Sequence, residues 1–193
     1  AGRTCYKSEE KITDDSAIEF CRSIIKRGHL SVIEHTSITV KFIIDRGISH
    51  EFVRHRLCAF SQESTRYCNY KNRVTFVIPP WITDILPGWY DNLIDNVSNT
   101  SRLWFDCMFR AEENYRKLLE LGWIPQQARS ILPNSLKTEL VVTANLREWQ
   151  HIFSLRCAEV AHPQMREVMN PLREEFRKRI PVIFNKENKY GIT

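Results

Sequence analysis

Residues 137–156 read Lys-Thr-Glu-Leu-Val-Val-Thr-Ala-Asn-Leu-Arg-Glu-Trp-Gln-His-Ile-Phe-Ser-Leu-Arg, and the pattern of apolar residues changes at Asn145. Before Asn145, the β-branched and apolar residues predict a strand over residues 137–144. After it, apolar side chains recur at helical spacing and predict a helix from Leu146 to Val160. A strand that leads directly into a helix indicates a fold that combines a sheet with helices.

A similar unit lies earlier in the chain. The alternating, β-branched residues 36–44 predict a strand, and the residues from Ile48 to Ala59 predict a short helix. Residues 60–73 are polar and predict a loop. Residues 74–78 predict another strand, which ends at two consecutive prolines.

The remaining elements are predicted to be helical. A helix follows the acidic segment at residues 13–15 and ends at Gly28, where a glycine commonly ends a helix. Apolar spacing predicts a long helix over about residues 100–121, a turn over residues 126–131 and a last helix over residues 163–179. The order α, β, α, β, α, β, α, α indicates an α+β or mixed α/β fold.

Length and composition fit one globular domain over residues 1–193. The chain is 42% apolar and 26% charged, which is enough apolar material for a core and excludes a disordered chain. Its 6 Gly and 8 Pro exclude a collagen-like chain. No apolar run approaches the roughly 18 residues that span a bilayer, and the first residues form no hydrophobic signal segment. We therefore expect no contact with a membrane.

The six cysteines lie at irregular spacing, without a Cys-x-x-Cys pair. Their even number is compatible with disulfides, but a chain of this size does not depend on them. We predict six free thiols in a reducing compartment, and therefore a cytoplasmic protein.

The formal net charge of +5 is concentrated in one segment. Residues 54–73 hold five basic side chains and Glu63 as the one acidic side chain. A solvent-exposed basic face would explain this excess, and so would an anion site. Nucleic acid is one candidate anion, because Phe60, Tyr67 and Tyr70 could stack bases between the phosphate contacts. A small phosphorylated ligand is the other.

Several common site motifs are absent. The chain has no Gly-x-Gly, so it carries neither a dinucleotide fingerprint nor a P-loop. The pairs His29 with His35 and His50 with His55 are spaced so that they do not share one helix face, and we predict no metal site. Any nucleotide must therefore be bound by side chains, chiefly arginines.

The densest polar cluster covers residues 54–67. On a helix, Arg54 and Arg56 would point about 200° apart, so they would contact two ligands, or one ligand and a neighbouring chain. The short hydroxyl and amide side chains of residues 61–65 are suited to binding a phosphate. A polar loop is the simpler interpretation, but its arginines would repel one another without an anion.

A second polar cluster lies on the helix predicted after Asn145. Arg147 and His151 are four residues apart and share one face. Arg156 lies half a turn away between apolar neighbours, and a buried arginine needs a partner. Two polar faces on one helix suggest two ligands or a subunit interface, and a surface helix is the alternative.

These clusters together resemble a known family. Arg54-His55-Arg56, followed after seven residues by Ser64, resembles the signature of flavin-dependent thymidylate synthases. Three further elements follow the order of that family: His29-x-Ser31-x-x-Glu34-His35, Ala128-Arg129-x-x-Leu132-Pro133, and Asn145-x-Arg147 with His151 and Leu155-Arg156. The resemblance covers about residues 3–172, and four elements in register are far more specific than Arg-His-Arg alone.

The resemblance implies a fold and an activity. The fold is that of thymidylate synthase-complementing proteins, α+β with a central, mostly antiparallel sheet flanked by helices, assembled as a homotetramer, and its first strand is missing before Arg3. The activity is a methyl transfer that makes dTMP from dUMP, with 5,10-methylenetetrahydrofolate as carbon donor and NADPH as reductant through bound FAD. Nucleic acid is not among the implied partners.

The resemblance also assigns residues to ligands. The dUMP site would comprise Glu51, Phe52, Val53, Arg54, Gln62, Glu63, Ser64, Thr65, Arg66, Arg129 and Arg156. The FAD site would comprise Ser31, Arg54, His55, Arg56, Gln62, Asn145, Leu146, Arg147 and His151. Arg156 resembles the catalytic residue that stabilises the uracil ring as an anion. Glu51, Ser61 and Gln62 depart from the residues that many members carry.

Two other functional interpretations stay open. One is a nucleic-acid-binding module built on the basic segment. The other is a family member that binds nucleotide without turnover, because Glu51 and Gln62 depart from the usual pattern. Ser64 could be drawn as a nucleophile, but no base is evident beside it, so we expect it to be a phosphate or ring ligand. His29 is a candidate contact of the flavin or the folate.

Overall fold

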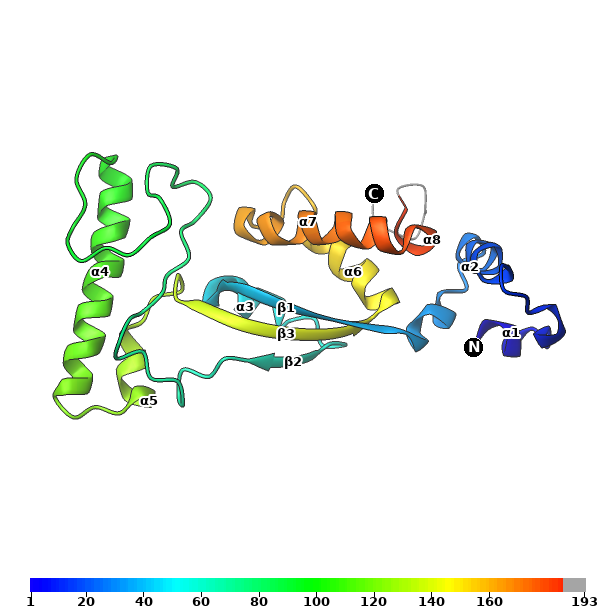
Figure 1. The fold of residues 1–193 in the computed structure, drawn as a ribbon, viewed down its shortest axis with the longest axis horizontal. Coiled ribbons are helices and arrows are strands. Elements are labelled where there is room, and N and C mark those ends of the chain that lie inside the picture. Colours follow the sequence, from blue (N-terminus) through cyan, green and yellow to red (C-terminus); the bar gives the residue numbers. More distant parts are fainter. Residues whose placement is uncertain (186–193) are drawn as a thin grey trace. The chain divides into compact units, whose positions relative to one another are not determined.

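The structure is a computed structural model that describes residues 1–185 (Figure 1). Contacts within the chain define two compact units. Unit 1 comprises residues 1–40 and 55–59, together with residues 142–185 of those described. Unit 2 comprises residues 41–54 and 60–141. Each unit is described by itself below. The prediction of one domain over residues 1–193 stays a prediction, and residues 186–193 lie outside the described part.

Three strands form a small antiparallel sheet with the order β1–β3–β2 (Figure 1). They are β1 (Ser37–Asp45), β2 (Ala59–Gln62) and β3 (Lys137–Asn145). Every second residue of β3 is buried from Thr138 to Ala144, because successive side chains of a strand point to opposite faces. The sheet and the surrounding helices confirm the predicted mixed helix and sheet fold.

Unit 1 is mainly helical. Its helices are α1 (Gly2–Cys5), η1 (Glu9–Lys11), α2 (Ser16–Lys26), η2 (Leu30–His35), α6 (Leu146–Arg156), α7 (Pro163–Arg179) and α8 (Pro181–Phe184). Helix α7 packs on α6, and α8 packs on α7 and α2. The core of these contacts is aromatic, because Trp149, Phe153, Phe176 and Phe184 are buried and their rings touch one another.

Unit 2 contains α3 (Arg46–Phe52), the long α4 (Asn99–Glu120), α5 (Pro125–Ala128) and η3 (Arg129–Ile131). Helix α5 and η3 pack against α4. Val74, Tyr115, Ala128 and Leu136 form a buried cluster in this unit. Its size is sufficient to hold residues 70–76 against α4, although these residues form no long strand.

The two helices that follow long strands begin in the same way. The Asp45 side chain caps α3 by accepting a hydrogen bond from Ile48 N at 2.7 Å. The Asn145 side chain caps α6 by accepting one from Glu148 N at 2.8 Å. Each side-chain oxygen satisfies a backbone N–H that has no partner within the helix. A short acid or amide at the strand end therefore turns the chain from strand to helix.

Several predictions are confirmed. The helices α2, α4 and α7 and the strands β1 and β3 lie where the sequence places them, and all six cysteines are free. Gly28 has a φ of +74°, in the left-handed region that glycine favours after a helix. None of the helices within residues 1–185 is long and apolar enough to cross a bilayer.

Other predictions are wrong. The helix expected over residues 48–59 begins at Arg46 and ends at Phe52. Arg54 and Arg56 therefore do not lie on a helix, and the expectation that helix geometry points their side chains in different directions does not apply. The expected loop over residues 60–73 begins with strand β2, because its backbone pairs with β3, which local sequence does not reveal.

The predicted strand over residues 74–78 is also wrong, since only an isolated bridge joins Phe76 to Leu136. The prolines that follow end the pairing because they lack an N–H donor. Helix α6 ends at Arg156 rather than at Val160. The chain then turns before Pro163 opens α7, and a proline is well tolerated at that first helical position.

Candidate active site

In unit 1, a buried histidine lies between an arginine and a glutamate. The Nε of Arg156, at the end of α6, donates a hydrogen bond of 2.9 Å to Nε2 of His55. On the other side of the ring, Nδ1 lies 3.5 Å from Oε1 of Glu148, in the first turn of α6. His55 and Glu148 are 5% and 6% exposed. The three side chains therefore form a line from a buried carboxyl group to a guanidinium.

This geometry determines the protonation state of His55. The Arg156 Nε can only donate, so Nε2 of His55 must accept and the neutral ring carries its hydrogen on Nδ1. Burial, with the nearby charges of Arg156 and His151, lowers the pKa of His55 to about 4. Burial raises the pKa of Glu148 above its usual value. His55 is thus a neutral hydrogen-bond acceptor at neutral pH.

The nearby cysteine is not a nucleophile. Burial, with a contribution from the charge of Glu148, raises the pKa of Cys58 to about 11. At neutral pH Cys58 is therefore a thiol rather than the reactive thiolate. Cys58 therefore lacks the low pKa that is typical of a nucleophilic cysteine.

Most residues predicted to bind FAD belong to unit 1. Ser31, Arg56, Arg147 and His151 are exposed, and the His151 ring lies 5.9 Å from that of His55. They are hydrogen-bond donors, and two of them carry a fixed positive charge, so the set fits a dinucleotide with its diphosphate and ribose hydroxyls.

Three unit 1 residues of this predicted site, one of them Arg147, also have contacts within the protein. Arg147 forms an ion pair with Glu34 of η2. The Asn145 side-chain oxygen caps α6. Leu146 is only 4% exposed, and its backbone N–H donates to the Thr36 carbonyl at 3.0 Å. Arg54 and Gln62, which the prediction also includes, belong to unit 2.

One group of described residues has the composition of a metal site. Ligand atoms of His55, Glu148 and His151 all lie within 4.8 Å of one another. However, the Nε2 of His55 already accepts a hydrogen bond from Arg156, and the guanidinium cation beside it repels a second cation. The group is therefore better described as a hydrogen-bonded and electrostatic cluster than as a metal centre. The prediction of no metal stays a prediction.

In unit 2, the residues predicted to bind the dUMP phosphate form a compact loop. The exposed Arg129 donates from Nη1 to Oγ1 of Thr65 at 3.1 Å, and Thr65 is 5% exposed. The Ser64 hydroxyl accepts from Arg66 N at 3.3 Å, and the Ser64 carbonyl accepts from Cys68 N at 2.9 Å. Thr65 holds Arg129, and the backbone of the loop is closed by Ser64.

The Gln62 side chain is held within unit 2. Its Nε2 donates to Oγ of Ser49 at 2.8 Å and lies 3.3 Å from Oγ1 of Thr138. These bonds tie β2 to α3 and β3. The departure at Gln62 therefore has a structural role, whichever ligand it also meets.

The Glu63 carboxylate is also engaged. It accepts from the Tyr70 hydroxyl at 2.7 Å and from Lys137 Nζ at 3.1 Å. Burial, and then the hydrogen bond to Glu63, raise the pKa of Tyr70. Lys137 also donates to Glu139 at 2.8 Å. The Glu63 side chain therefore stabilises this part of the fold, and its backbone N–H also donates to the Glu139 carbonyl at 2.9 Å.

The segment at the end of α3 is mixed. Phe52 is 1% exposed and packs edge to face against Phe42 and Phe60, so it belongs to the core of this unit. Val53 and Arg54 are exposed, and Glu51 is half-buried. Of these predicted dUMP contacts, Arg54 offers the most accessible charge.

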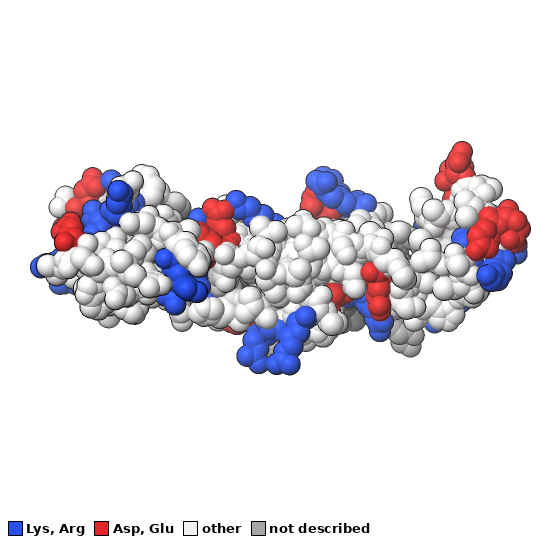
Figure 2. All heavy atoms as spheres, turned by 90° about the horizontal axis from the view of Figure 1, so that it is seen from below, with Lys and Arg blue, Asp and Glu red and all other residues white. Residues whose placement is uncertain are grey.

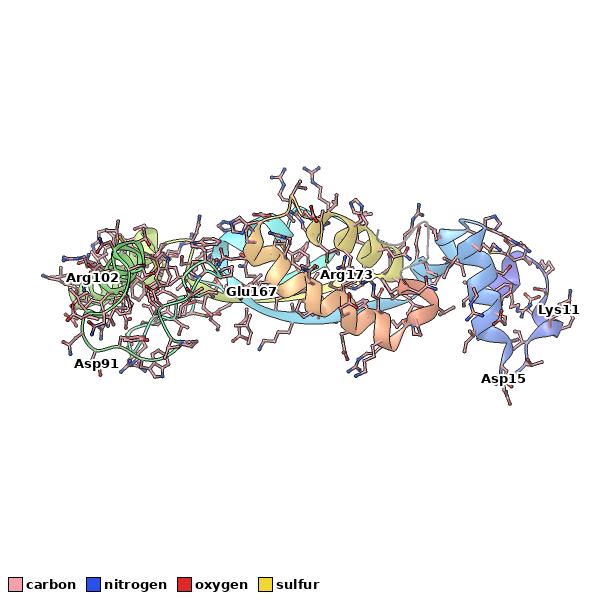
Figure 3. All side chains as sticks on the ribbon, turned by 90° about the horizontal axis from the view of Figure 1, so that it is seen from above. Lys11, Asp15, Asp91, Arg102, Glu167 and Arg173 are labelled. Carbon is pink, nitrogen blue, oxygen red and sulfur yellow. The ribbon has the colours of Figure 1, made fainter. Side chains whose placement is uncertain are left out.

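Some arginines outside the motifs have acidic partners. Arg73 lies 3.2 Å from Asp91, and Arg102 lies 3.0 Å from Asp95 (Asp91 and Arg102 are labelled in Figure 3). On the face shown in Figure 2, basic side chains occur in separate groups rather than in one continuous track.

By contrast, the motif arginines Arg54, Arg56, Arg66 and Arg129 form no ion pair within the described residues 1–185. Positive charge without a protein counterion is what an anionic ligand requires.

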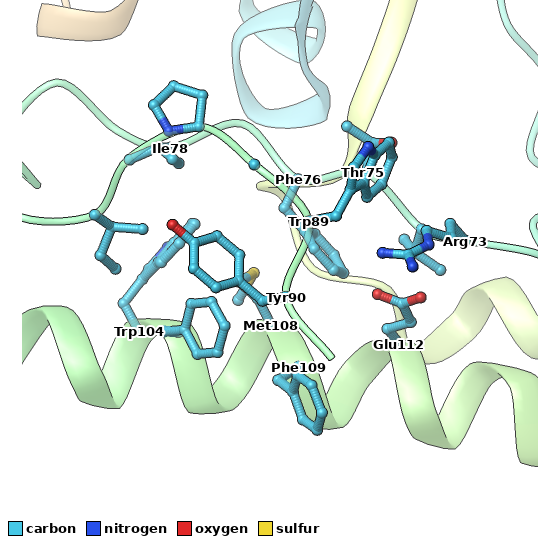
Figure 4. Close-up of a pocket in the computed structure, with 15 residues that line it drawn as sticks. Arg73, Thr75, Phe76, Ile78, Trp89, Tyr90, Trp104, Met108, Phe109 and Glu112 are labelled. Atoms are coloured by element: carbon cyan, nitrogen blue, oxygen red, sulfur yellow. The ribbon is translucent and has the colours of Figure 1, made fainter. Parts of the chain in front are cut away.

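A separate apolar pocket of about 590 Å³ lies in unit 2, between residues 73–90 and α4 (Figure 4). Aromatic side chains such as Trp89 and Trp104 form its walls, and Arg73 and Glu112 lie at the same end. The Arg73 guanidinium lies 4.8 Å from the centre of the Trp89 ring. None of the lining residues belongs to the predicted dUMP or FAD sites, and sequence reasoning did not anticipate this pocket.

Sequence reasoning also missed Glu148. The signal was present, because an acid stands directly beside the large apolar side chain of Trp149. However, Glu148 is also the third residue after the cap Asn145, where an acid commonly supports a helix start. That local explanation concealed its contact with His55.

Comparisons with known proteins identify the family of the chain. Residues 1–182 match a family model described as thymidylate synthase complementing protein. A protein of Geobacter sulfurreducens, named flavin-dependent thymidylate synthase, is 31% identical over 191 residues, which cover 95% of this chain and 78% of that protein. A protein of the same name from Mycobacterium sp. (strain JLS) is 33% identical over 196 residues, covering 95% and 76%. One from Corynebacterium diphtheriae is 31% identical over 192 residues, covering 96% and 75%.

Proposed function

The chain belongs to the thymidylate synthase complementing protein family, and from this premise we propose that it is an FAD-dependent thymidylate synthase. The observation that carries the proposal is the Arg156 guanidinium, held by a buried neutral histidine in the unit that also presents exposed donors for a dinucleotide. Such a cation, fixed in place before the reaction, is suited to stabilising negative charge on a ring.

The proposed reaction is the reductive methylation of dUMP to dTMP. The methylene carbon of 5,10-methylenetetrahydrofolate forms a bond to the fifth carbon of uracil, which loses its proton. The bonds from the methylene carbon to the folate nitrogens break, so that tetrahydrofolate leaves. FAD, held by the residues of the predicted FAD site, would supply the hydride that completes the methyl group, with NADPH as the source of electrons. The protein's own residues bind, orient and polarise the substrates.

Arg156 is the proposed catalytic residue. A neutral pyrimidine is a weak nucleophile at its fifth carbon, and ionisation of the ring increases its nucleophilicity. A guanidinium held against the ring favours the ionised form by Coulomb attraction, which is stronger where water is excluded. His55 orients this guanidinium without neutralising it.

Other motif residues are proposed to bind. Arg129, with Ser64 and Arg66, would bind the dUMP phosphate, since these arginines have no acidic partner among the described residues. Arg56, Arg147 and His151, with Ser31, Asn145 and Leu146, would bind FAD. We propose that Ser64 is a ligand and not a nucleophile.

We further propose that the chain works as a homotetramer, as the family resemblance implies. Sedimentation equilibrium should give about four times the chain mass of 22.9 kDa. A monomer under conditions of full activity would contradict this part of the proposal without affecting the proposed reaction.

The first test is an absorbance spectrum of the purified protein before and after addition of FAD, followed by a dTMP assay with folate and NADPH. We expect flavin bands that remain with the protein through gel filtration, and turnover that needs all three substrates. A protein that binds neither FAD nor dUMP would overturn the proposal. Binding of both without turnover would favour the non-catalytic family member.

A further inference from the structure

We infer that Glu148 is a positioning residue, which acts through the neutral ring of His55 to fix the guanidinium of Arg156. This inference rests on the proposed function for the role of Arg156, but not for the arrangement of the three side chains. It assigns a role to a buried acid outside all the motif residues.

The hydrogen bond between Arg156 and His55 can run in only one direction. Arg156 Nε lies 2.9 Å from His55 Nε2 and has a hydrogen to donate. The bond therefore exists only while Nε2 is unprotonated. A ring with its hydrogen on Nε2, or a doubly protonated ring, would set two donors against each other.

The group that faces Nδ1 of His55 selects the tautomer of the ring. The tautomer of a histidine is set by what its other nitrogen faces. Here Nδ1 faces Oε1 of Glu148 at 3.5 Å, a distance for an electrostatic contact rather than a short hydrogen bond. An acceptor oxygen at this position favours a hydrogen on Nδ1, and so keeps Nε2 available to Arg156.

Burial strengthens the contact between His55 and Glu148. His55 and Glu148 are 5% and 6% exposed, so little water competes for their polar atoms, and the contact is stronger than it would be at the surface. The other titratable groups that act on this pair are His151, on the exposed face of α6, and Cys58. Cys58 remains a neutral thiol, so the glutamate is the acidic group on the Nδ1 side.

A neutral and a charged hydrogen-bond partner affect the guanidinium of Arg156 differently. A carboxylate in direct contact with Arg156 would form an ion pair and reduce the attraction of the guanidinium for a ring anion. A neutral imidazole gives the same direction to the bond and adds no opposite charge. Glu148 acts at one remove, where its effect is on the ring rather than on the guanidinium.

The test uses two-bond 1H–15N correlation spectra of the full chain labelled with 15N-histidine, without substrates. Signals of His55 are assigned from the spectrum of His55→Asn. Three variants are compared: Glu148→Leu removes the acceptor, Glu148→Gln keeps an acceptor oxygen, and Gln150→Leu is the matched control. Gln150 is a buried polar residue of the same helix that donates to the Ile183 carbonyl at 3.1 Å instead of facing His55.

We expect the wild type, Gln150→Leu and Glu148→Gln to show the neutral Nδ1–H ring, and Glu148→Leu to lose it. With the holoenzyme, Glu148→Leu should lower kcat by roughly 10- to 100-fold, as outer-shell partners of other sites do, and leave the FAD affinity nearly unchanged. Glu148→Gln should retain most of the activity.

A wild-type ring with its hydrogen on Nε2 would overturn the inference, whether or not any variant folds. So would a folded Glu148→Leu protein that keeps both the Nδ1–H ring and its kcat. Because the spectra need neither substrate nor flavin, failure of the proposed function, seen as a wild type without turnover, is distinguished from failure of this inference.

Discussion

Arg156 in unit 1 and Arg129 in unit 2 each donate a hydrogen bond to a neutral acceptor. The two acceptors differ in the contacts that they make with the rest of the protein. The holder of Arg156 is a buried imidazole with a carboxyl group on its far side, at 2.9 and 3.5 Å. The holder of Arg129 is the hydroxyl of Thr65, at 3.1 Å. A hydroxyl rotates about one bond and can donate or accept, whereas the imidazole has a fixed plane and one permitted tautomer.

The difference indicates two tasks. An arginine that binds a phosphate needs charge and some freedom to follow its ligand, because the phosphate is already anionic. An arginine that stabilises charge which develops during a reaction must be in place beforehand. The more elaborate support of Arg156 therefore fits a catalytic role, and the simpler support of Arg129 fits binding.

The largest expected effect is that of Arg156→Ala. We expect kcat to fall by roughly 100- to 1,000-fold, the usual cost of removing one preorganised electrostatic group, while FAD remains bound. Steady-state turnover and flavin absorbance measure the two effects separately. Equal losses of turnover and flavin affinity would assign Arg156 to the wrong ligand.

The next effect concerns stability against pH. The pKa of His55 is lowered to about 4, so between about pH 6.5 and 4 the unfolded chain binds the proton that the folded chain excludes. Stability present above pH 6.5 is thus lost as the pH falls through this window, by about 3 kcal/mol in all. Urea unfolding at a series of pH values measures the slope.

In the same measurement, His55→Asn should flatten this part of the slope. His50→Asn, a change at an exposed histidine of α3, should leave it as steep as in the wild type. Identical slopes for the wild type and His55→Asn would show that His55 is not a buried neutral group.

Arg129→Ala should act on binding instead of turnover. Loss of a charged hydrogen-bond donor costs about 1.5–3 kcal/mol, so the Kd of dUMP should rise by roughly 10- to 100-fold with little change in kcat at saturation. Calorimetric titration with dUMP measures it. Arg102→Ala, an exposed arginine paired with Asp95 in the same unit, is the control and should bind dUMP normally.

The smallest expected effect is that of Thr65→Val, which removes the hydroxyl that holds Arg129. A single neutral acceptor contributes about 1 kcal/mol, so dUMP should bind roughly fivefold more weakly. Thr39→Val removes a hydroxyl 2.8 Å from that of Thr143 on the exposed sheet face and should have no effect on the Kd. A larger rise in the Kd of dUMP for Thr65→Val than for Arg129→Ala would contradict the view that Thr65 acts on dUMP by holding Arg129.

Local patterns predicted the elements in which apolar residues recur regularly over a long stretch of the chain. Helix α4 has apolar residues at helical spacing over its whole length, and β3 alternates buried and less buried residues, so both were found. Strand β2 has only four residues and forms because β3 offers it a partner. The Arg-His-Arg segment was found as a motif but was placed on a helix that ends before it.

By itself, the sequence determined the family and the long helices and strands, and it predicted which arginines carry the chemistry, since these depend on residue types at fixed spacing. Tertiary structure decided which side chains hold those arginines. His55 and Arg156 are 101 positions apart, and the fold brings them to 2.9 Å. Burial then makes the histidine neutral, because a low-dielectric interior disfavours its charged form, and no local pattern of residues encodes burial at that distance.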